Sequence, residues 1–483
     1  MAEHVHMIGI GGTGMSSIAT VLLQMGYKVS GSDVKESAVV SSLQDAGADV
    51  HIGHAASHVA GADMVIFSSA IPEDNPEIRE ARRLGIPLLH RSEMLARILN
   101  NHEGIAVAGA HGKTTITGMI AQVFSCLGLE PTVLAGGEMQ NQCVHACWGR
   151  GKYVVAEADE SDGTLLRYYP QIAVITSVEA DHLENFGGRL SQLIDTYAGF
   201  LANIKPGGTL VISSQAYRVL QDSIRKANGR FAVVVYGLEG ESGEALPGEY
   251  QAGALFPLDY RAADIKLSGS SSSFAVYHSG KMLGRAKLVV PGVYNVENAL
   301  AAVAVSREAG LGFDQIVKAL EGFHGAHRRF ELVGAGPGIV VYDDYAHHPT
   351  ELKKTLEAAR HFGRRVVAIF QPQRYSRTKI LMEEFARSFQ DADLVVITDI
   401  YAPPPETPLP GVTAERLAGL VAEHIGRERV LYVGDKRLIP DVLLPHLGSN
   451  DLVITMGAGD VWQVGPAVLE RLQEENLKEL QLP

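Results

Sequence analysis

Residues 108–115 read AGAHGKTT, and the segments on either side of them differ in character. Residues 104–109, GIAVAG, form a short apolar run typical of a buried strand, whereas residues 114–128, TTITGMIAQVFSCLG, are predicted to form a helix. A glycine-rich turn from a strand into a helix presents backbone N–H groups and a helix N-terminus, and both bind phosphate oxygens. The stretch therefore predicts a phosphate-binding loop in an α/β domain.

Two side chains of this loop suit a triphosphate. Lys113 is expected to neutralise charge on the outer phosphates, and the hydroxyl of Thr114 is expected to bind Mg²⁺. The strict loop pattern has a glycine five positions before Gly112, where this chain has Val107, so the loop is a shortened variant. The alternative is a helix N-terminus that happens to carry Gly-Lys-Thr, which the apolar strand before it disfavours.

Acidic residues follow two further strand-like runs in the same part of the chain. Residues 156–162 read AEADESD and residues 178–182 read VEADH. Carboxyl ends of neighbouring parallel strands meet at one edge of a sheet, and hard oxygen ligands there suit Mg²⁺. The candidates are Glu157, Asp159, Glu160, Asp162, Glu179, Asp181 and His182. A solvated acidic loop is the alternative for either segment alone.

A second glycine-rich turn lies near the N-terminus. Gly9, Gly11 and Gly14 form the pattern G-x-G-x-x-G between an apolar run and a predicted helix, and Asp33 ends the next strand-like run, YKVSGSD. By itself this pattern indicates a dinucleotide site. The turn supplies close backbone approach to a diphosphate, which other nucleotides also carry, so Asp33 does not discriminate among them.

Polar clusters also follow strands in the last third of the chain. Residues 343–351, DDYAHHPTE, include His347 and His348, and we favour polar substrate contacts over zinc because no third ligand is suitably spaced. Residues 371–379, QPQRYSRTK, offer cations for carboxylates or phosphates, with a solvated basic loop as the alternative. Arg328 and Arg329 lie beside a predicted hinge.

Strand and helix patterns alternate along most of the 483 residues, which predicts three consecutive α/β domains. The first and third are expected to be Rossmann-like and the second to resemble a phosphate-loop ATPase. The predicted boundaries give domains 1–102, 103–325 and 326–483, with RILNNHEG (97–104) as a linker between the first two. Residues 245–291 are expected to contain antiparallel strands.

The composition excludes several classes of protein. The formal charge is −13 without a basic run, which argues against a nucleic-acid partner. No apolar run reaches the length that spans a bilayer, so we expect no membrane partner. Three cysteines are too few for a disulfide framework, and a cytoplasmic location is predicted. The oligomeric state stays open, a homodimer included.

Eight motifs in order, GIGGTGMSSIA, AGAHGKTT, AEADESD, VEADH, YNVENALAA, RRFE, DDYAHHPTE and QPQRYSRT, resemble the Mur ligase family over essentially the whole chain. The resemblance implies an ATP-dependent ligase that uses Mg²⁺ and joins L-alanine to the lactyl carboxylate of UDP-N-acetylmuramate through an acyl phosphate, in peptidoglycan precursor synthesis. A recycling ligase that adds a tripeptide to the same UDP-sugar is the first alternative. An NAD-dependent oxidoreductase and a non-catalytic ATP-dependent binding protein are the others.

The resemblance also implies roles for each domain and for single residues. Residues 1–102 would bind the UDP-sugar, residues 103–325 ATP and residues 326–483 the amino acid. The UDP-sugar would contact Gly11, Gly12, Thr13, Gly14, Met15, Ser16, Asp33, Ser69 and Arg91. ATP would contact Gly109, Ala110, His111, Gly112, Lys113, Thr114, Thr115, Asn295, Asn298, Arg329 and Asp344. The implied metal ligands are Thr114, Glu157 and His182, and the implied catalytic residues are Lys113, His182, His348, Arg374 and Arg377.

The chain departs from the family pattern at five positions: Ala110, His327, Ala346, Gln373 and Lys379. The usual residues there are Thr, Gly, Gly, His and Arg. Three of the departures, His327, Gln373 and Lys379, border the expected amino-acid pocket, so they bear on the choice of alanine more than on the class of reaction.

Overall fold

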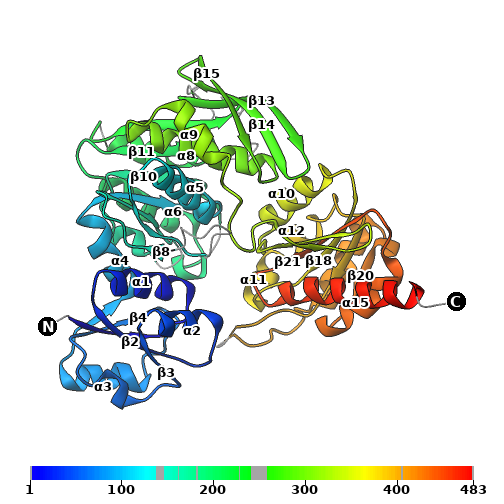
Figure 1. Ribbon diagram of the computed structural model, residues 1–483, viewed down its shortest axis with the longest axis horizontal. Helices are drawn as coiled ribbons and strands as arrows, with labels where there is room; N and C mark the ends of the chain where they lie inside the picture. The colour runs from blue at the N-terminus through cyan, green and yellow to red at the C-terminus, as the bar shows by residue number, and fades with distance from the viewer. Residues whose placement is uncertain are drawn as a thin grey trace. The chain divides into compact units, whose positions relative to one another are not determined.

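The structure is a computed structural model, and it describes residues 3–137, 146–160, 163–180, 183–227, 229–240, 258–403 and 406–480. The chain forms three α/β domains on three separate sheets (Figure 1). The N-terminal and central sheets belong mainly to one compact unit, made of residues 1–264, 274–287 and 296–324. A second unit, made of residues 265–273, 288–295 and 325–483, contains the C-terminal sheet.

The N-terminal sheet is Rossmann-like, as predicted. Its five strands are all parallel and lie in the order β3-β2-β1-β4-β5. The strands are β1 (His4–Ile8), β2 (Lys28–Asp33), β3 (Asp49–Ile52), β4 (Met64–Phe67) and β5 (Leu88–His90). The helices are α1 (Thr13–Gln24), α2 (Ala38–Asp45), α3 (Pro76–Leu84) and α4 (Arg91–Asn100). The strand order reverses at β1, so the glycine-rich turn after β1 lies where doubly wound sheets bind ligands.

The central sheet has ten strands in the order β15-β14-β13-β12-β11-β10-β6-β9-β7-β8. The strands are β6 (Glu103–Ala108), β7 (Thr132–Leu134), β8 (Ala146–Cys147), β9 (Tyr153–Glu157), β10 (Ile172–Ile175), β11 (Thr209–Ser213), β12 (Ala232–Leu238), β13 (Tyr260–Ser268), β14 (Ser271–His278) and β15 (Lys281–Leu288). Its helices are α5 (Lys113–Cys126), α6 (Leu190–Ala202), α7 (Ser214–Lys226), α8 (Val293–Glu308) and α9 (Phe313–Leu320). Strand β6 pairs in parallel with β9 and β10, so the three carboxyl ends meet beside the phosphate-binding loop.

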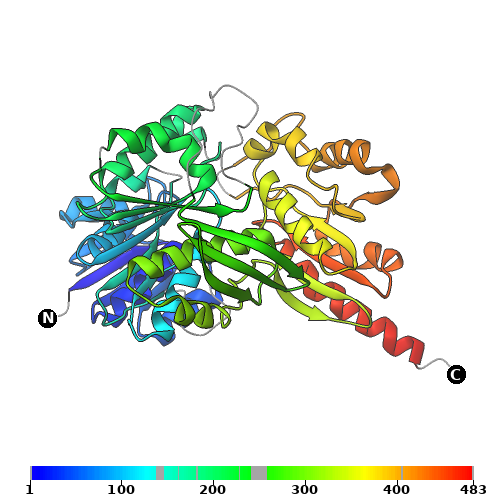
Figure 2. The same ribbon diagram turned by 90° about the horizontal axis from the view of Figure 1, so that it is seen from above.

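The last three strands of this sheet form the predicted antiparallel segment. Residues 269–270 join β13 to β14 and residues 279–280 join β14 to β15. A two-residue connection joins only antiparallel neighbours. Figure 2 shows these strands as a long green ribbon that extends from the central sheet.

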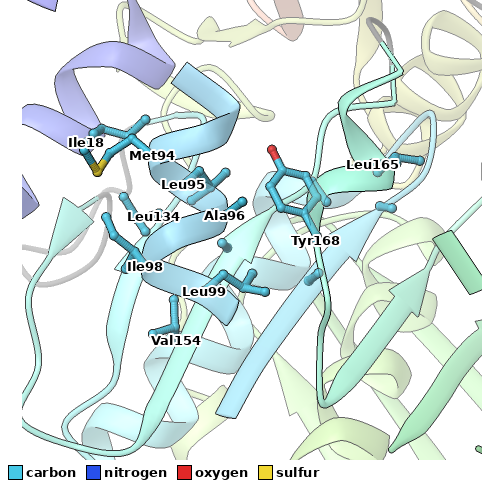
Figure 3. Packing of buried hydrophobic residues seen from close by; sticks show 14 of the residues in the cluster. Ile18, Met94, Leu95, Ala96, Ile98, Leu99, Leu134, Val154, Leu165 and Tyr168 are labelled. Carbon is cyan, nitrogen blue, oxygen red and sulfur yellow. The ribbon is translucent and has the colours of Figure 1, made fainter. Parts of the chain in front are cut away.

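The predicted linker at residues 97–104 is wrong. Its first residues complete helix α4, in which Met94, Leu95, Ile98 and Leu99 are buried. These side chains pack between α1 and the strands of the central sheet, so one hydrophobic core runs through the first two domains (Figure 3). The two asparagines and Gly104 suggested a linker, but the apolar spacing of residues 94–99 makes its first part a packed helix.

The C-terminal sheet has the order β16-β17-β21-β18-β19-β20, with β16 antiparallel and the other strands parallel. The strands are β16 (Glu331–Ala335), β17 (Val340–Asp344), β18 (Arg365–Phe370), β19 (Leu394–Ile397), β20 (Val430–Tyr432) and β21 (Asp451–Met456). The helices are α10 (Pro349–Arg360), α11 (Tyr375–Ile380), α12 (Met382–Ala386), α13 (Ala414–Ile425), α14 (Ile439–Leu443) and α15 (Val464–Leu480), the last drawn in red in Figure 1. This is also a doubly wound, Rossmann-like sheet, with a strand order different from that of the first.

Candidate active site

The phosphate-binding loop connects β6 to α5, and two glycines give it its shape. Gly109 has φ +129°, and a Cβ at this position would collide with the hydroxyl of Thr176. Gly112 precedes α5 with φ +82°, and a Cβ there would lie 2.7 Å from Oδ1 of Asn298. Both positions favour glycine because left-handed backbone and close neighbours leave no room for a side chain.

The loop is fixed to the segment that follows β10. The N–H of Ala110 donates to the carbonyl of Ser177 at 3.2 Å, and the N–H of His111 donates to the Ser177 hydroxyl at 3.1 Å. The ring of His111 lies 3.3 Å from a carboxylate oxygen of Glu179. These two N–H groups therefore hold the loop in shape and have protein partners.

The first turn of α5 carries backbone donors of a different kind. Among the residues that the structure describes, no side chain caps this helix. Within the described part of the chain, the N–H groups of Gly112, Lys113, Thr114 and Thr115 have no acceptor. Uncapped N–H groups and the positive end of the helix dipole together make a site for an anion.

Lys113 brings a positive charge to the same place. Its ammonium group donates to the carbonyl of Gly109 at 2.6 Å and lies 2.9 Å from both carboxylate oxygens of Glu160. Burial alone would lower the pKa of Lys113, but the carboxylates of Glu160, Asp159 and Glu157 raise it above its usual range. The lysine is therefore charged at neutral pH.

Two of the implied metal ligands flank one Gly-Gly turn. A Cβ on Gly136 would lie 2.7 Å from Oε2 of Glu157, and a Cβ on Gly137 would lie 3.3 Å from Cγ2 of Thr114. The Gly136 N–H also donates to Glu157 at 2.8 Å. A carboxylate and a hydroxyl are hard oxygen donors of the kind that Mg²⁺ prefers, so the residues fit this ion. The third implied ligand, His182, lies outside the described residues, as do Asp162 and Asp181.

The two asparagines at the start of α8 differ in their surroundings. The amide oxygen of Asn298 lies beside Gly112, where it occupies the space that a side chain on residue 112 would need. Asn295 is buried, and its amide group donates to the carbonyl of Pro291 at 2.7 Å. That bond fixes the first turn of α8.

The glycine turn of the first domain is bound by Asp33. The Gly11 N–H donates to this carboxylate at 2.9 Å. Gly12 precedes α1, and no side chain in the described ranges caps this helix. Thr13 begins the helix, and the side chain of Met15 is buried in the hydrophobic core. As at α5, an uncapped helix start faces the place expected for a phosphate group.

Arg91 joins this turn to the central domain. A Cβ on Gly14 would lie 3.2 Å from the Arg91 guanidinium, which forms an ion pair with Asp159 at 2.8 Å. The hydroxyl of Ser69 lies 3.0 Å from the ring of His90, and His90 is the residue before Arg91. Asp159 therefore pairs with Arg91, a cation beside the first glycine-rich turn, and Glu160 pairs with Lys113 of the second.

Asp344 ends β17 and is buried. Its carboxylate accepts hydrogen bonds of 2.7 Å from the N–H groups of Phe330 and Ala346. Burial raises its pKa to about 6, although Arg329 opposes the shift. The Arg329 guanidinium lies over the ring of Tyr345, 5.2 Å from its centroid.

His347 and His348 lie at the N-terminus of α10 and take part in its capping. The ring of His348 accepts from the N–H of Thr350, and the carboxylate of Glu351 accepts from the N–H groups of both histidines. This reciprocal arrangement is a capping box. Burial lowers the pKa of His347 to about 4, so its ring is neutral at pH 7.

Arg374 and Arg377 lie in the segment after β18. Arg377 donates to the side-chain oxygen of Gln373 at 2.9 Å. Arg374 is exposed, and among the described residues its guanidinium has no hydrogen-bond or ion-pair partner. Its backbone has φ +68°, which a residue with a side chain adopts at a cost, so the position of Arg374 is held by its surroundings.

The structure gives two residues of the site roles that were not predicted from the sequence. Glu160 was one of several acidic candidates, and nothing in its spacing marks it as the partner of Lys113. Glu351 caps α10 and lies 3.6 Å from Arg329. A glutamate three residues after a helix N-cap is the sequence signal that predicts such a role.

Comparison with known proteins places this arrangement in a class. Residues 4–103 match the model of the Mur ligase family, catalytic domain, residues 107–306 the Mur ligase middle domain, and residues 328–459 the Mur ligase, glutamate ligase domain. The chain belongs to the Mur ligase family. The predicted boundaries at 102 and 325 stay predictions.

Individual relatives are similar over nearly their full length. The chain is 45% identical to UDP-N-acetylmuramate–L-alanine ligase of Geobacter sp. (strain M21), over 98% of both chains. It is 46% identical to the ligase of the same name from Symbiobacterium thermophilum, over 98% of this chain and 95% of the relative. The crystal structure of UDP-N-acetylmuramate-alanine ligase from Thermotoga maritima has a TM-score of 0.80 and 29% identity, covering 98% and 99% of the two chains.

A murein peptide ligase from Psychrobacter arcticus shares the fold, with a TM-score of 0.68 and 24% identity over 98% of this chain and 99% of that chain. None of the helices in the described ranges is long and apolar enough to cross a bilayer.

Proposed function

We propose that this protein is an ATP-dependent ligase that joins L-alanine to the lactyl carboxylate of UDP-N-acetylmuramate in peptidoglycan precursor synthesis. Curated relatives of that name, 41% to 46% identical to the chain, support the substrates. One observation supports the chemistry: Lys113 lies at the uncapped start of α5, where donors and positive charge suit the phosphates of ATP.

The reaction requires activation because a carboxylate carbon resists attack by an amine. Transfer of the γ-phosphoryl group from ATP to the lactyl carboxylate forms an acyl phosphate and releases ADP. The neutral amine of L-alanine then attacks the acyl carbon, and inorganic phosphate leaves as the amide bond forms. In this scheme Lys113 and the N–H groups of α5 stabilise the charge on the phosphoryl group during its transfer.

The proposed residues divide among the three domains. The UDP-sugar binds at the glycine turn of residues 1–102, beside Arg91 and Ser69, and ATP binds at the loop of residues 103–325. Residues 326–483 receive L-alanine, with Arg374, Arg377 and His348 near the reacting groups and Arg329 and Asp344 toward ATP. We propose a cytoplasmic location because the reaction consumes ATP and a sugar nucleotide.

Thr114 and Glu157 are the described residues that would hold Mg²⁺, with His182 as a further ligand implied by the family. The ion would neutralise phosphate charge as the phosphoryl group is transferred. These residues offer oxygen donors beside one turn, which is what the ion requires.

Release of inorganic phosphate tests the proposal. Purified protein with Mg²⁺, ATP, UDP-N-acetylmuramate and L-alanine should release phosphate, and omission of any one substrate should stop it. Release of phosphate at the same rate with and without UDP-N-acetylmuramate would contradict the proposal. Glycine, L-serine and the tripeptide L-Ala-γ-D-Glu-meso-diaminopimelate are the competing amines, and preferential use of the tripeptide would favour a recycling ligase. Small amino acids differ by only about 1–3 kcal/mol in binding, so the panel must be quantitative.

A further inference from the structure

The first domain contains a buried charged cluster away from both glycine-rich loops. Glu77 in α3 and His6 in β1 are fully buried. Oε2 of Glu77 accepts from the Ser32 hydroxyl at 2.6 Å and lies 3.4 Å from His54. Oε1 accepts from the ring of His58 at 2.8 Å. We call Glu77, Ser32, His54, His58 and His6 the Glu77 network.

Glu77 is ionised in the folded protein. Burial alone would raise its pKa, but the groups of His6, Ser32 and His58 around it lower the pKa to about 2. Its own N–H donates to Asn75, the N-cap of α3, so the carboxylate also lies at the positive end of that helix. A buried charge is costly, and here every oxygen has donors that offset the cost.

The partners of Glu77 lead directly to the glycine turn. The carbonyl of Ser32 accepts the N–H groups of Gly9 at 2.8 Å and Ile10 at 3.0 Å. The next residue, Asp33, accepts the N–H of Gly11 at 2.9 Å. Oε1 of Glu77 also accepts the backbone N–H of Ala55 at 3.3 Å, so the network connects the end of β2 to the segment that follows β3.

We propose that Glu77 is a positioning residue for the sugar-nucleotide site, acting through Ser32 on the Gly9–Gly11 turn. The inference rests on the proposed function, because it assigns that turn to a UDP-sugar. Two acceptor oxygens are needed to hold Ser32, His58 and Ala55 together. An amide in place of the carboxylate has one acceptor oxygen in place of two and carries no charge, so at least one of these groups must give up the hydrogen bond that it donates to Glu77.

Titration calorimetry on the full chain at 15 °C tests this role, with UDP-N-acetylmuramate and with Mg·ADP as separate probes. Glu77→Gln should weaken UDP-N-acetylmuramate binding by about tenfold or more, because small displacements of binding groups are costly, and should leave Mg·ADP binding unchanged. Ile78→Ala is the matched control, because Ile78 is the next residue of α3 and is buried in an apolar cluster. It should lower the melting temperature and leave the affinity for both nucleotides unchanged.

Ser32→Ala gives the same readout if Glu77→Gln folds poorly. It should weaken UDP-N-acetylmuramate binding alone, and the double variant should add little to Glu77→Gln. Unchanged UDP-sugar affinity in Glu77→Gln or in Ser32→Ala, or equal weakening of both nucleotides, would overturn the positioning role. Absence of UDP-sugar binding by the wild type would overturn the proposed function and this inference with it, so the two failures are distinguishable.

Discussion

The ammonium group of Lys113 lies 2.9 Å from each carboxylate oxygen of Glu160. The lysine that is proposed to bind the phosphates of ATP therefore has a partner of opposite charge already. Both side chains are largely shielded from water, with 18% and 5% of their surface exposed, so the pair is not a weak surface contact. A triphosphate that binds Lys113 competes with this carboxylate. Variants of Lys113 and Glu160 can therefore distinguish what the lysine contributes to catalysis from what it contributes to stability.

Lys113→Ala should abolish turnover and spare UDP-sugar binding. Loss of a charge that stabilises the transferred phosphoryl group should lower kcat by about 10²–10³-fold or more. Phosphate release measures the first effect, and calorimetry with UDP-N-acetylmuramate measures the second. Lys152→Ala is the control because Lys152 forms an exposed ion pair with Glu103. Full activity of Lys113→Ala would refute the assigned role.

The same variant should also lose stability, for a reason unrelated to catalysis. Without Lys113, Glu160 is a buried carboxylate without its cation, which costs about 3 kcal/mol. The double variant Lys113→Ala/Glu160→Gln should regain most of that stability in chemical denaturation and should remain inactive. Recovery of activity in the double variant would show that the lysine matters only for folding.

Glu160→Gln alone should tighten binding of ATP. The amide removes a charged competitor for the ammonium group, and a hydrogen bond to a charged group is worth about 1.5 kcal/mol, roughly tenfold in affinity. Calorimetry with a non-hydrolysable ATP analogue measures the change. Weaker binding would show that Glu160 helps to place Lys113 for the nucleotide and does not compete with it.

Gly109→Ala should lower the free energy of unfolding by more than the positive φ of this position alone would cost. The new methyl group would meet Thr176, so backbone strain and overpacking together should cost about 3 kcal/mol. Gly128→Ala is the matched control, because Gly128 also has positive φ but open space around its Cα, and should cost about 1 kcal/mol. Equal losses in chemical denaturation would contradict the steric argument.

Much of this site follows from local sequence. The apolar run before AGAHGKTT and the helix after it predicted β6, the loop and α5, because a strand-turn-helix phosphate site is set by neighbouring residues. The pairing of Lys113 with Glu160 could not be predicted. It depends on β6 lying between β9 and β10, and strand order is a property of the whole sheet.

Two other features were not predicted, for different reasons. Arg374 has a positive φ that Arg does not prefer, and its N–H donates to the carbonyl of Tyr401, a residue distant in sequence, so its own sequence does not predict this backbone. Helix α4 was misjudged as a linker because Asn100, Asn101 and Gly104 outweighed the apolar spacing before them. The buried side chains of α4 show that the apolar pattern was the better guide.

The stability of the third domain should depend on pH through Asp344. Its pKa is about 6 in the folded protein, against a usual value of 3.8. Because the folded state holds the proton more tightly, this group's contribution to stability is fully present below pH 3.8 and is lost as the pH rises through about 6. The difference corresponds to about 3 kcal/mol. Asp344→Asn removes the dependence, so the wild type should lose about this much stability relative to the variant between pH 4 and pH 7.

The fluorescence of Trp462 reports this change, because it is the one tryptophan of the last third of the chain and Trp148 is the only other. Urea unfolding is followed in a Trp148→Phe background at several pH values between 4 and 7. His347, with a pKa of about 4 in place of 6.5, shifts stability in the opposite direction, so the difference between wild type and variant is the quantity to compare. In the Trp462→Phe background, the urea unfolding transition that Trp148 reports should be the same with and without Asp344→Asn. A wild-type-minus-variant difference that is constant across this pH range would show that Asp344 ionises normally and that burial does not hold its proton.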